Sequence, residues 1–175
     1  MRWDDLFDDL DARLAHVQRV EREAEVDDRR VADLAAVDLL GRLLAGDGEL
    51  SVQLPDGGWV SGRLRAAGRG WLLLVTGPPL RRQVLVPVTA VCALRGLSPR
   101  SVQPGPVAAR RTLGAALRAL AAAGVEVLVR TRAADVRGRL VRVGADHVDV
   151  AAPGRDPQAV VTVPLASLLS VTDLG

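Results

Sequence analysis

The sequence predicts a mostly β protein with helices: two five-stranded small β-barrels in tandem, each preceded by a helix, after a long N-terminal amphipathic helix. Two observations predict this fold class. Residues 61–74, SGRLRAAGRGWLLL, and residues 137–150, RGRLVRVGADHVDV, repeat one pattern of glycines and alternating apolar residues, which indicates a duplicated β unit. Residues 3 to about 45 have no proline, no glycine before Gly41, and apolar residues three or four apart, which is typical of a helix.

The N-terminal segment, residues 1–37, is expected to be an acidic amphipathic helix or a helical hairpin. A straight helix to residue 45 would be ~60 Å long, longer than a body of this size. The helix therefore either folds back near residues 27–29, or projects and pairs with another chain as a coiled coil, and the heptad pattern leaves both alternatives open. Five apolar residues are the candidate partner-helix interface: Trp3, Phe7, Leu10, Leu14 and Val17.

The first β unit is expected to span residues 38–97. The turn PDGG at 55–58 separates two strands, WLLLV at 71–75 forms a third, and the loop GPPLRR at 77–82 precedes a fourth and a short fifth strand. WLLLV is apolar on both faces, so another part of the chain, the N-terminal helix or the other barrel, is expected to cover its outer face.

The second β unit is expected to span residues 112–175. Residues 98–111 carry three prolines and no periodicity, which predicts a linker rich in proline and arginine. Residues 112–124 then predict a short helix that ends at Gly124, followed by five strands. Five strongly bent strands of this size are expected to close into a small barrel, since closure removes exposed strand edges.

The two units match closely. An offset of 76 superposes Gly62 on Gly138 and Leu64 on Leu140, and an offset of 77 superposes Val86-Pro87 on Val163-Pro164. With the Asp-Gly turn at 56–57, this pattern resembles the Sm-like family, the fold of Sm proteins and of the bacterial RNA chaperone Hfq. The resemblance implies Sm-like (SH3-like) barrels that bind RNA or pair edge to edge. The whole chain is also similar to proteins of high-GC Gram-positive bacteria, a resemblance that implies no activity.

The residues that bind bases in the Sm-like family are not retained. Gly68 and Leu72 of the first unit, and Gly144 and Val148 of the second, replace the Asp and Asn that shape the uridine pocket of Sm proteins. The resemblance is therefore specific for the fold and weak for the function. Any contact with nucleic acid is expected to be made with the phosphate backbone rather than with the bases.

Charge is divided unevenly along the chain. The net charge is +2, and all 23 basic residues are arginine. Residues 1–48 carry 13 acidic and 7 basic side chains, whereas the rest carries 8 acidic and 16 basic ones. Because arginine binds phosphate bidentately, the first unit and the linker are the expected site of an anionic partner. Ten residues are the nucleic-acid-binding candidates: Trp59, Arg63, Arg65, Arg69, Trp71, Arg81, Arg82, Arg100, Arg110 and Arg111.

Two functions remain open. In the first, a non-enzymatic Sm-like protein binds RNA or DNA, RNA being favoured, through these arginines, with the tryptophans as stacking residues. In the second, the chain is a protein-interaction or assembly module without a nucleic-acid ligand, which associates through its N-terminal helix or its barrel edge strands. In either case no catalytic residue set, metal or cofactor is expected.

The cellular location follows from what the sequence lacks. No basic and apolar leader of a secretory signal opens the chain, no apolar run reaches the length of a membrane helix, and the single cysteine, Cys92, is expected to be a buried structural thiol. We therefore expect a cytoplasmic protein without a membrane partner.

Overall fold

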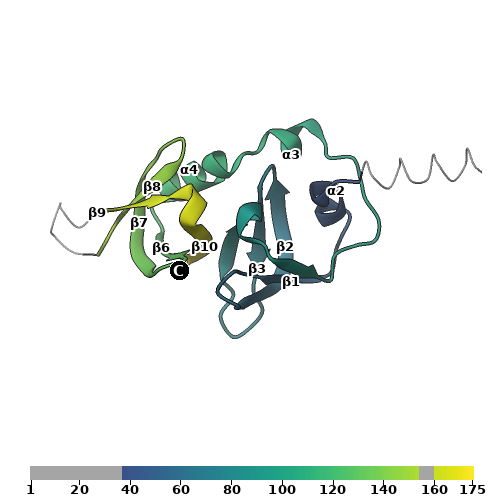
Figure 1. Ribbon diagram of the computed structural model, residues 1–175, viewed down its shortest axis with the longest axis horizontal. Helices are drawn as coiled ribbons and strands as arrows, with labels where there is room; N and C mark the ends of the chain where they lie inside the picture. The colour runs from purple at the N-terminus through teal and green to yellow at the C-terminus, as the bar shows by residue number, and fades with distance from the viewer. Residues whose placement is uncertain (1–36, 154–159) are drawn as a thin grey trace, which may run out of the picture. The chain divides into compact units, whose positions relative to one another are not determined.

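The computed structural model describes residues 37–153 and 160–175, which are mostly β (Figure 1). Residues 39–175 form one compact unit. The strands of the first repeat are β1 (Glu49–Gln53), β2 (Trp59–Gly68), β3 (Trp71–Val75), β4 (Gln83–Pro87) and β5 (Ala93–Arg95). Those of the second repeat are β6 (Glu126–Thr131), β7 (Asp135–Val143), β8 (His147–Ala151), β9 (Val160–Pro164) and β10 (Leu168–Asp173). A 3₁₀ turn precedes the fifth strand of each repeat: η1 (Val88–Ala90) and η2 (Leu165–Ser167).

Within the described residues, three short helices accompany the strands. Helix α2 (Leu39–Leu44) precedes β1, and α4 (Leu113–Ala123) precedes β6. The hydroxyl of Thr112 caps α4 by accepting the backbone N–H of Ala115. Gly124 ends the helix with a φ of 64°, as the sequence predicted. A further helix, α3 (Pro106–Arg110), lies within the predicted linker and begins with a proline at its first position, where the missing N–H costs nothing.

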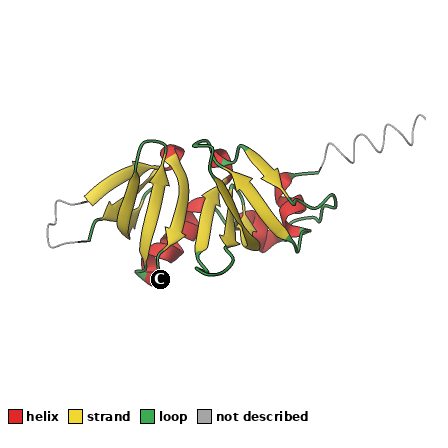
Figure 2. Ribbon diagram, turned by 90° about the horizontal axis from the view of Figure 1, so that it is seen from below, coloured by secondary structure: helices red, strands yellow, loops and turns green. Residues whose placement is uncertain are grey.

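The ten described strands belong to one antiparallel sheet, ordered β5-β1-β2-β3-β4-β10-β6-β7-β8-β9. Figure 2 shows the strands in yellow. Within each repeat the first strand pairs with both the second and the fifth, so the two repeats share one internal topology. The repeats are joined by β4 and β10, where Leu85 lies opposite Val171 and Val84 opposite Thr172. Among the described strands, two edges have no partner strand, on β5 and on β9.

The prediction of two closed barrels was wrong. Closure would require the fourth and fifth strands of each repeat to pair with each other. Instead β4 pairs with β10 of the other repeat, while β5 and β9 each pair with a single neighbour, so the sheet is open. The duplication pattern indicated which residues face the core. The alternation of apolar residues within a strand, however, carries no information about which other strand pairs with it.

The coiled coil is corrected as well. The described residues are mostly β, and their helices have 6, 5 and 11 residues, too short to form a heptad seam. The candidate interface residues Trp3, Phe7, Leu10, Leu14 and Val17 lie outside the described residues.

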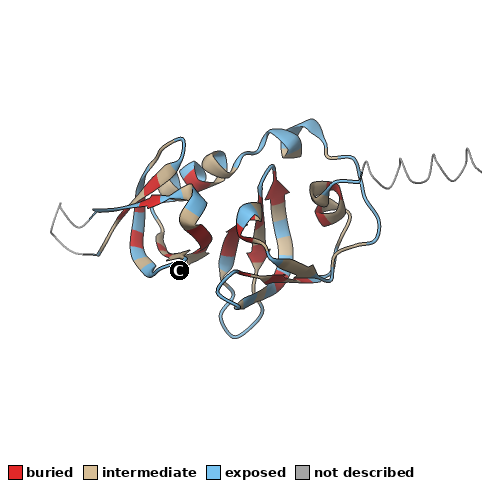
Figure 3. Ribbon diagram, viewed as in Figure 1, coloured by how far each residue is buried: buried red, intermediate tan, exposed pale blue. Residues whose placement is uncertain are grey.

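Two hydrophobic cores lie against this sheet, and each contains residues of the other repeat. Figure 3 shows buried positions in red on the strands of both repeats. Leu169 of β10 is buried in the core of the first repeat. In return, Trp71 and Leu85 are buried in the core of the second repeat, together with Leu117 of α4. The outer face of WLLLV is therefore covered by the second repeat, one of the two alternatives that the sequence suggested. This exchange ties the stability of the two repeats together.

Candidate functional site

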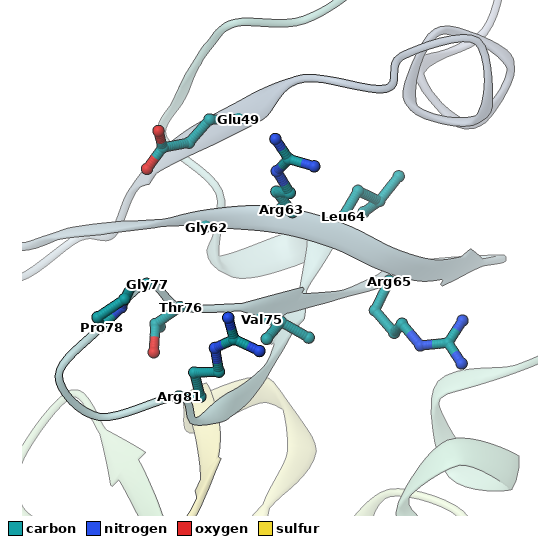
Figure 4. Close-up of a pocket in the computed structure, with 10 residues that line it drawn as sticks. All are labelled: Glu49, Gly62, Arg63, Leu64, Arg65, Val75, Thr76, Gly77, Pro78 and Arg81. Carbon is teal, nitrogen blue, oxygen red and sulfur yellow. The ribbon is translucent and has the colours of Figure 1, made fainter.

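Three of the predicted arginines line one pocket in the first repeat (Figure 4). Arg63 and Arg65 come from β2, and Arg81 comes from the loop between β3 and β4. The pocket has a volume of about 550 Å³. Its remaining wall is formed by Glu49, Gly62, Leu64, Val75, Thr76, Gly77 and Pro78. The structure thus brings together residues that are up to 32 positions apart in the sequence and gives them a common concave surface.

The bend of β2 over β3 shapes this pocket. Gly62 is buried, and a Cβ atom at this position would lie 2.5 Å from the backbone oxygen of Val75. Only glycine permits this approach, which also holds at Gly138 against the oxygen of Ala151. The register then places Arg63 opposite Glu49 on one side and opposite Val75 on the other.

Hydrogen bonds around Thr76 hold the loop that carries Arg81. The backbone N–H of Thr76 donates to the oxygen of Arg82 over 2.9 Å, and the Arg82 N–H donates to the Thr76 hydroxyl over 3.0 Å. That hydroxyl donates in turn to the oxygen of Leu80 over 2.8 Å. The loop is therefore closed by its own backbone, and the Arg81 side chain is left exposed at the pocket.

The charged groups of this pocket have no protein partners among the described residues. Across residues 37–153 and 160–175, Glu49, Arg63, Arg65 and Arg81 form no ion pair and no side-chain hydrogen bond. One carboxylate thus stands among three guanidinium groups. Unpaired arginines on a concave surface are suited to bind an anion, since five N–H donors of each guanidinium remain available.

The second repeat has an equivalent pocket with different charge pairing. It has a volume of about 400 Å³ and is lined by Glu126, Gly138, Arg139 and Val141, among others. Here Glu126 accepts two hydrogen bonds from Arg137, over 2.8 and 3.3 Å. These bonds lower the pKa of Glu126 and raise the pKa of Arg137.

Two further arginines of the second repeat also face carboxylates. Arg130 lies 3.6 Å from Asp56 and 3.7 Å from Asp135, and Arg142 lies 3.9 Å from Asp149. Several arginines of the second repeat are therefore neutralised within the protein, whereas those of the first-repeat pocket are not. The sequence showed the excess of positive charge in the first repeat, but it did not show this difference in pairing.

The two tryptophan candidates have different environments. Trp71 is only 6% exposed, and its indole N–H donates to the backbone oxygen of Arg111 over 2.9 Å. It is a core residue, and its ring is not available for stacking on a base. Trp59 is 39% exposed, and the guanidinium of Arg95 lies 4.3 Å from its ring centroid, a cation–π contact that covers one face.

The remaining arginine candidates do not line the pocket. The Arg69 backbone N–H donates to the oxygen of Arg111 over 2.9 Å, which places these two residues together at the end of β2 farther from Gly62. Arg100 and Arg110 are exposed in the segment between the repeats, and Arg82 is partly buried beside the pocket. The structure therefore divides the predicted arginines into a pocket group and a linker group.

The sequence interpretation missed Glu49, and it placed Cys92 incorrectly. Glu49 recurs as Glu126 at the offset of 77, so the repeat itself contained the signal that would have pointed to it. Cys92 is exposed rather than buried, because it lies in the short connection between η1 and β5, outside the alternation of the neighbouring strands.

Acidic, histidine and cysteine side chains are dispersed over the described part of the chain. No group of three or more of them there is arranged to hold a metal ion, and His147 instead hydrogen-bonds Asp146, Nδ1 to Oδ1, over 2.8 Å. None of the helices within residues 37–153 and 160–175 is long and apolar enough to cross a membrane.

Comparison with known proteins provides no relative: no protein-family model matches the chain, and no curated protein is significantly similar to it.

Proposed function

We propose that this protein is a non-enzymatic, cytoplasmic nucleic-acid-binding protein that contacts RNA through the arginines of its first repeat. The observation that supports this most is the contrast between two equivalent pockets: three arginines line the first, and of the described arginines only Arg139 lines the second, where the carboxylate of Glu126 is paired with Arg137. Arg63, Arg65 and Arg81 are unpaired among the described residues, whereas Glu126 in the second repeat is bonded to Arg137. Unpaired guanidinium groups that share a concave surface bind phosphate, and each bound phosphate releases counterions. The sequence resemblance to the Sm-like family favours RNA over DNA.

The test is equilibrium binding of a fluorescein-labelled single-stranded RNA of about 20 nucleotides, followed by anisotropy between about 50 and 300 mM salt. We expect a Kd of about 1 μM or lower at the lowest salt concentration, and a steep loss of affinity as salt rises. The triple variant Arg63→Gln, Arg65→Gln, Arg81→Gln is expected to reduce the slope of log K against log salt by about 2, at ~0.7 for each phosphate that is no longer neutralised.

The matched control removes arginines that are already paired. The variant Arg130→Gln, Arg137→Gln, Arg142→Gln removes the same formal charge from the second repeat, and we expect it to retain most of the salt dependence of the unmodified protein. An equal decrease for both triple variants would show that net charge, and not the pocket, determines binding. A protein that binds no RNA at low salt would eliminate the proposal.

A second function, assembly without nucleic acid, is favoured by a separate observation at the sheet edge. β9 corresponds to β4 in the repeat, and β4 pairs with β10, but the outer edge of β9 has no partner among the described strands. Val160 and Val161 on β9 are each 42% exposed. The complementary edge is that of β5, which corresponds to β10, so a second copy of the chain would supply the partner strand.

Sedimentation equilibrium tests this second function. An assembly module would form oligomers at micromolar concentration, and Val161→Lys, which places a charge on the open edge, would return them to monomers. A monomer at all concentrations up to about 100 μM would exclude self-assembly through this edge.

A further inference from the structure

The two equivalent pockets differ at the carboxylate as well as at the arginines. Glu49 and Glu126 begin the first strand of their repeats, and each lies directly opposite an arginine of the next strand, Arg63 and Arg139. The bend glycine and the neighbouring end of the third strand are also shared. The framework is thus duplicated, so differences between the two pockets can be assigned to individual side chains.

The decisive difference is the residue two positions before the shared arginine. In the second repeat this residue is Arg137, which bonds to Glu126 over 2.8 Å. In the first repeat it is Ser61, whose hydroxyl instead lies 2.7 Å from the hydroxyl of Ser51. Glu49 is therefore left without a donor among the described residues, although Arg63 is its cross-strand neighbour.

A free carboxylate next to phosphate-binding arginines weakens phosphate binding unless the ligand also offers it a hydrogen-bond donor. Val141 takes the place of Arg65 in the second repeat, so the first pocket combines its carboxylate with more positive charge than the second. The ligand that fits this combination carries a phosphate and a hydroxyl group. The ribose 2′-hydroxyl is such a donor, carboxylates commonly accept from ribose hydroxyls, and this group distinguishes RNA from DNA.

We infer that the first-repeat pocket holds one ribonucleotide unit of bound RNA, with its phosphate on Arg63 and Arg81 and its 2′-hydroxyl donating to Glu49. The labelled side chains come from β1, β2 and the loop after β3 (Figure 4), and Leu64, Val75 and Pro78 provide an apolar wall for the sugar. The volume of about 550 Å³ is in the range of pockets that bind small molecules. This inference rests on the proposed RNA binding and assigns its selectivity to one carboxylate.

The test compares three short strands of the sequence CAC repeated four times: RNA, DNA and 2′-O-methyl RNA. The strands contain neither uracil nor thymine, so they differ only at the sugar. We expect the RNA to bind about tenfold more tightly than either of the others, the effect of one hydrogen bond to a charged acceptor. Glu49→Ala is expected to reduce this ratio to about one.

The ratio of affinities is the readout because removal of a negative charge strengthens binding of all three strands alike. Glu126→Ala, at the equivalent position of the second repeat, is the matched control and is expected to leave the ratio unchanged. Equal binding of RNA and DNA by the unmodified protein would overturn this inference while leaving the proposed function intact, as would a ratio that Glu49→Ala does not alter. Absence of binding by all three strands would instead refute the proposed function itself.

Discussion

Replacement of Trp71 by phenylalanine tests whether this residue belongs to the core or to the binding surface. Trp71 is buried among residues of the second repeat, and its indole N–H donates to the Arg111 oxygen over 2.9 Å. Phenylalanine keeps an aromatic ring at this position but has no donor and a smaller surface. The change therefore removes one hydrogen bond and part of the packing while altering no charge.

The expected cost follows from these two effects. The Arg111 oxygen retains the N–H of Arg69 at 2.9 Å, so it is not left without a partner, and removal of the indole bond costs about 1 kcal/mol. The smaller ring buries ~40 Å² less surface, which at ~25 cal/mol per Å² is about 1 kcal/mol more. A total of about 2 kcal/mol corresponds to a decrease in Tm of about 4–8 °C for a protein of this size.

Thermal unfolding followed by circular dichroism measures this decrease, and RNA affinity is measured well below the Tm. We expect Trp71→Phe to lower the Tm while changing the RNA Kd less than about twofold. Trp59→Phe is the matched control, because Trp59 is 39% exposed and its replacement is expected to cost at most about 0.5 kcal/mol. An unchanged Tm together with weakened RNA binding by Trp71→Phe would refute the assignment of Trp71 to the core.

Three further predictions concern the bend, the exchanged core and the paired carboxylate. Gly62→Ala is expected to cost about 1–3 kcal/mol by overpacking, whereas Gly48→Ala, with no atom within 4 Å of its new Cβ, is expected to change the free energy of unfolding by less than about 0.5 kcal/mol in urea denaturation. Leu169→Ala is expected to lower the free energy of unfolding by about 2–5 kcal/mol. Because Leu169 belongs to one repeat and packs in the core of the other, we expect the variant to unfold in one cooperative transition. Two separate unfolding transitions would contradict this. Arg137→Gln is expected to raise the pKa of Glu126 toward its ordinary value in an NMR titration. Since the pKa of Glu126 is lowered in the folded protein, its interaction with Arg137 stabilises the fold fully above the ordinary pKa of glutamate, and this stabilisation is lost as pH falls through the lowered pKa. An identical pKa of Glu126 in the variant would disprove the role of Arg137.

The sequence was informative wherever one strand or helix determines its own form. The continuous apolar run at residues 71–75 and the end of α4 at Gly124 are local properties, and the structure has a strand and a helix end where they predict them. The repeated glycines also predicted a bend, because a close approach of two backbones leaves no space for a side chain.

The sequence could not show which distant segments and side chains pair with each other. Val86-Pro87 and Val163-Pro164 are identical, yet β4 pairs with β10 on its outer side whereas β9 forms an edge of the sheet. The free carboxylate of Glu49 likewise depends on Ser61 of the neighbouring strand, which stands where the second repeat has Arg137, and only the register shows that this position lies near Glu49. Arginine content predicted where positive charge accumulates, but only the structure shows which arginines already have an acidic partner.

The most direct test of the central claim, that the first repeat and not the second binds RNA, is ultraviolet crosslinking of bound RNA to the full-length protein. Mass spectrometry of the digested complex then locates the crosslinked peptides. We predict crosslinks within residues 49–82, which contain the pocket of Glu49, Arg63 and Arg81. Crosslinks confined to residues 126–153, which contain the equivalent pocket, would contradict the claim.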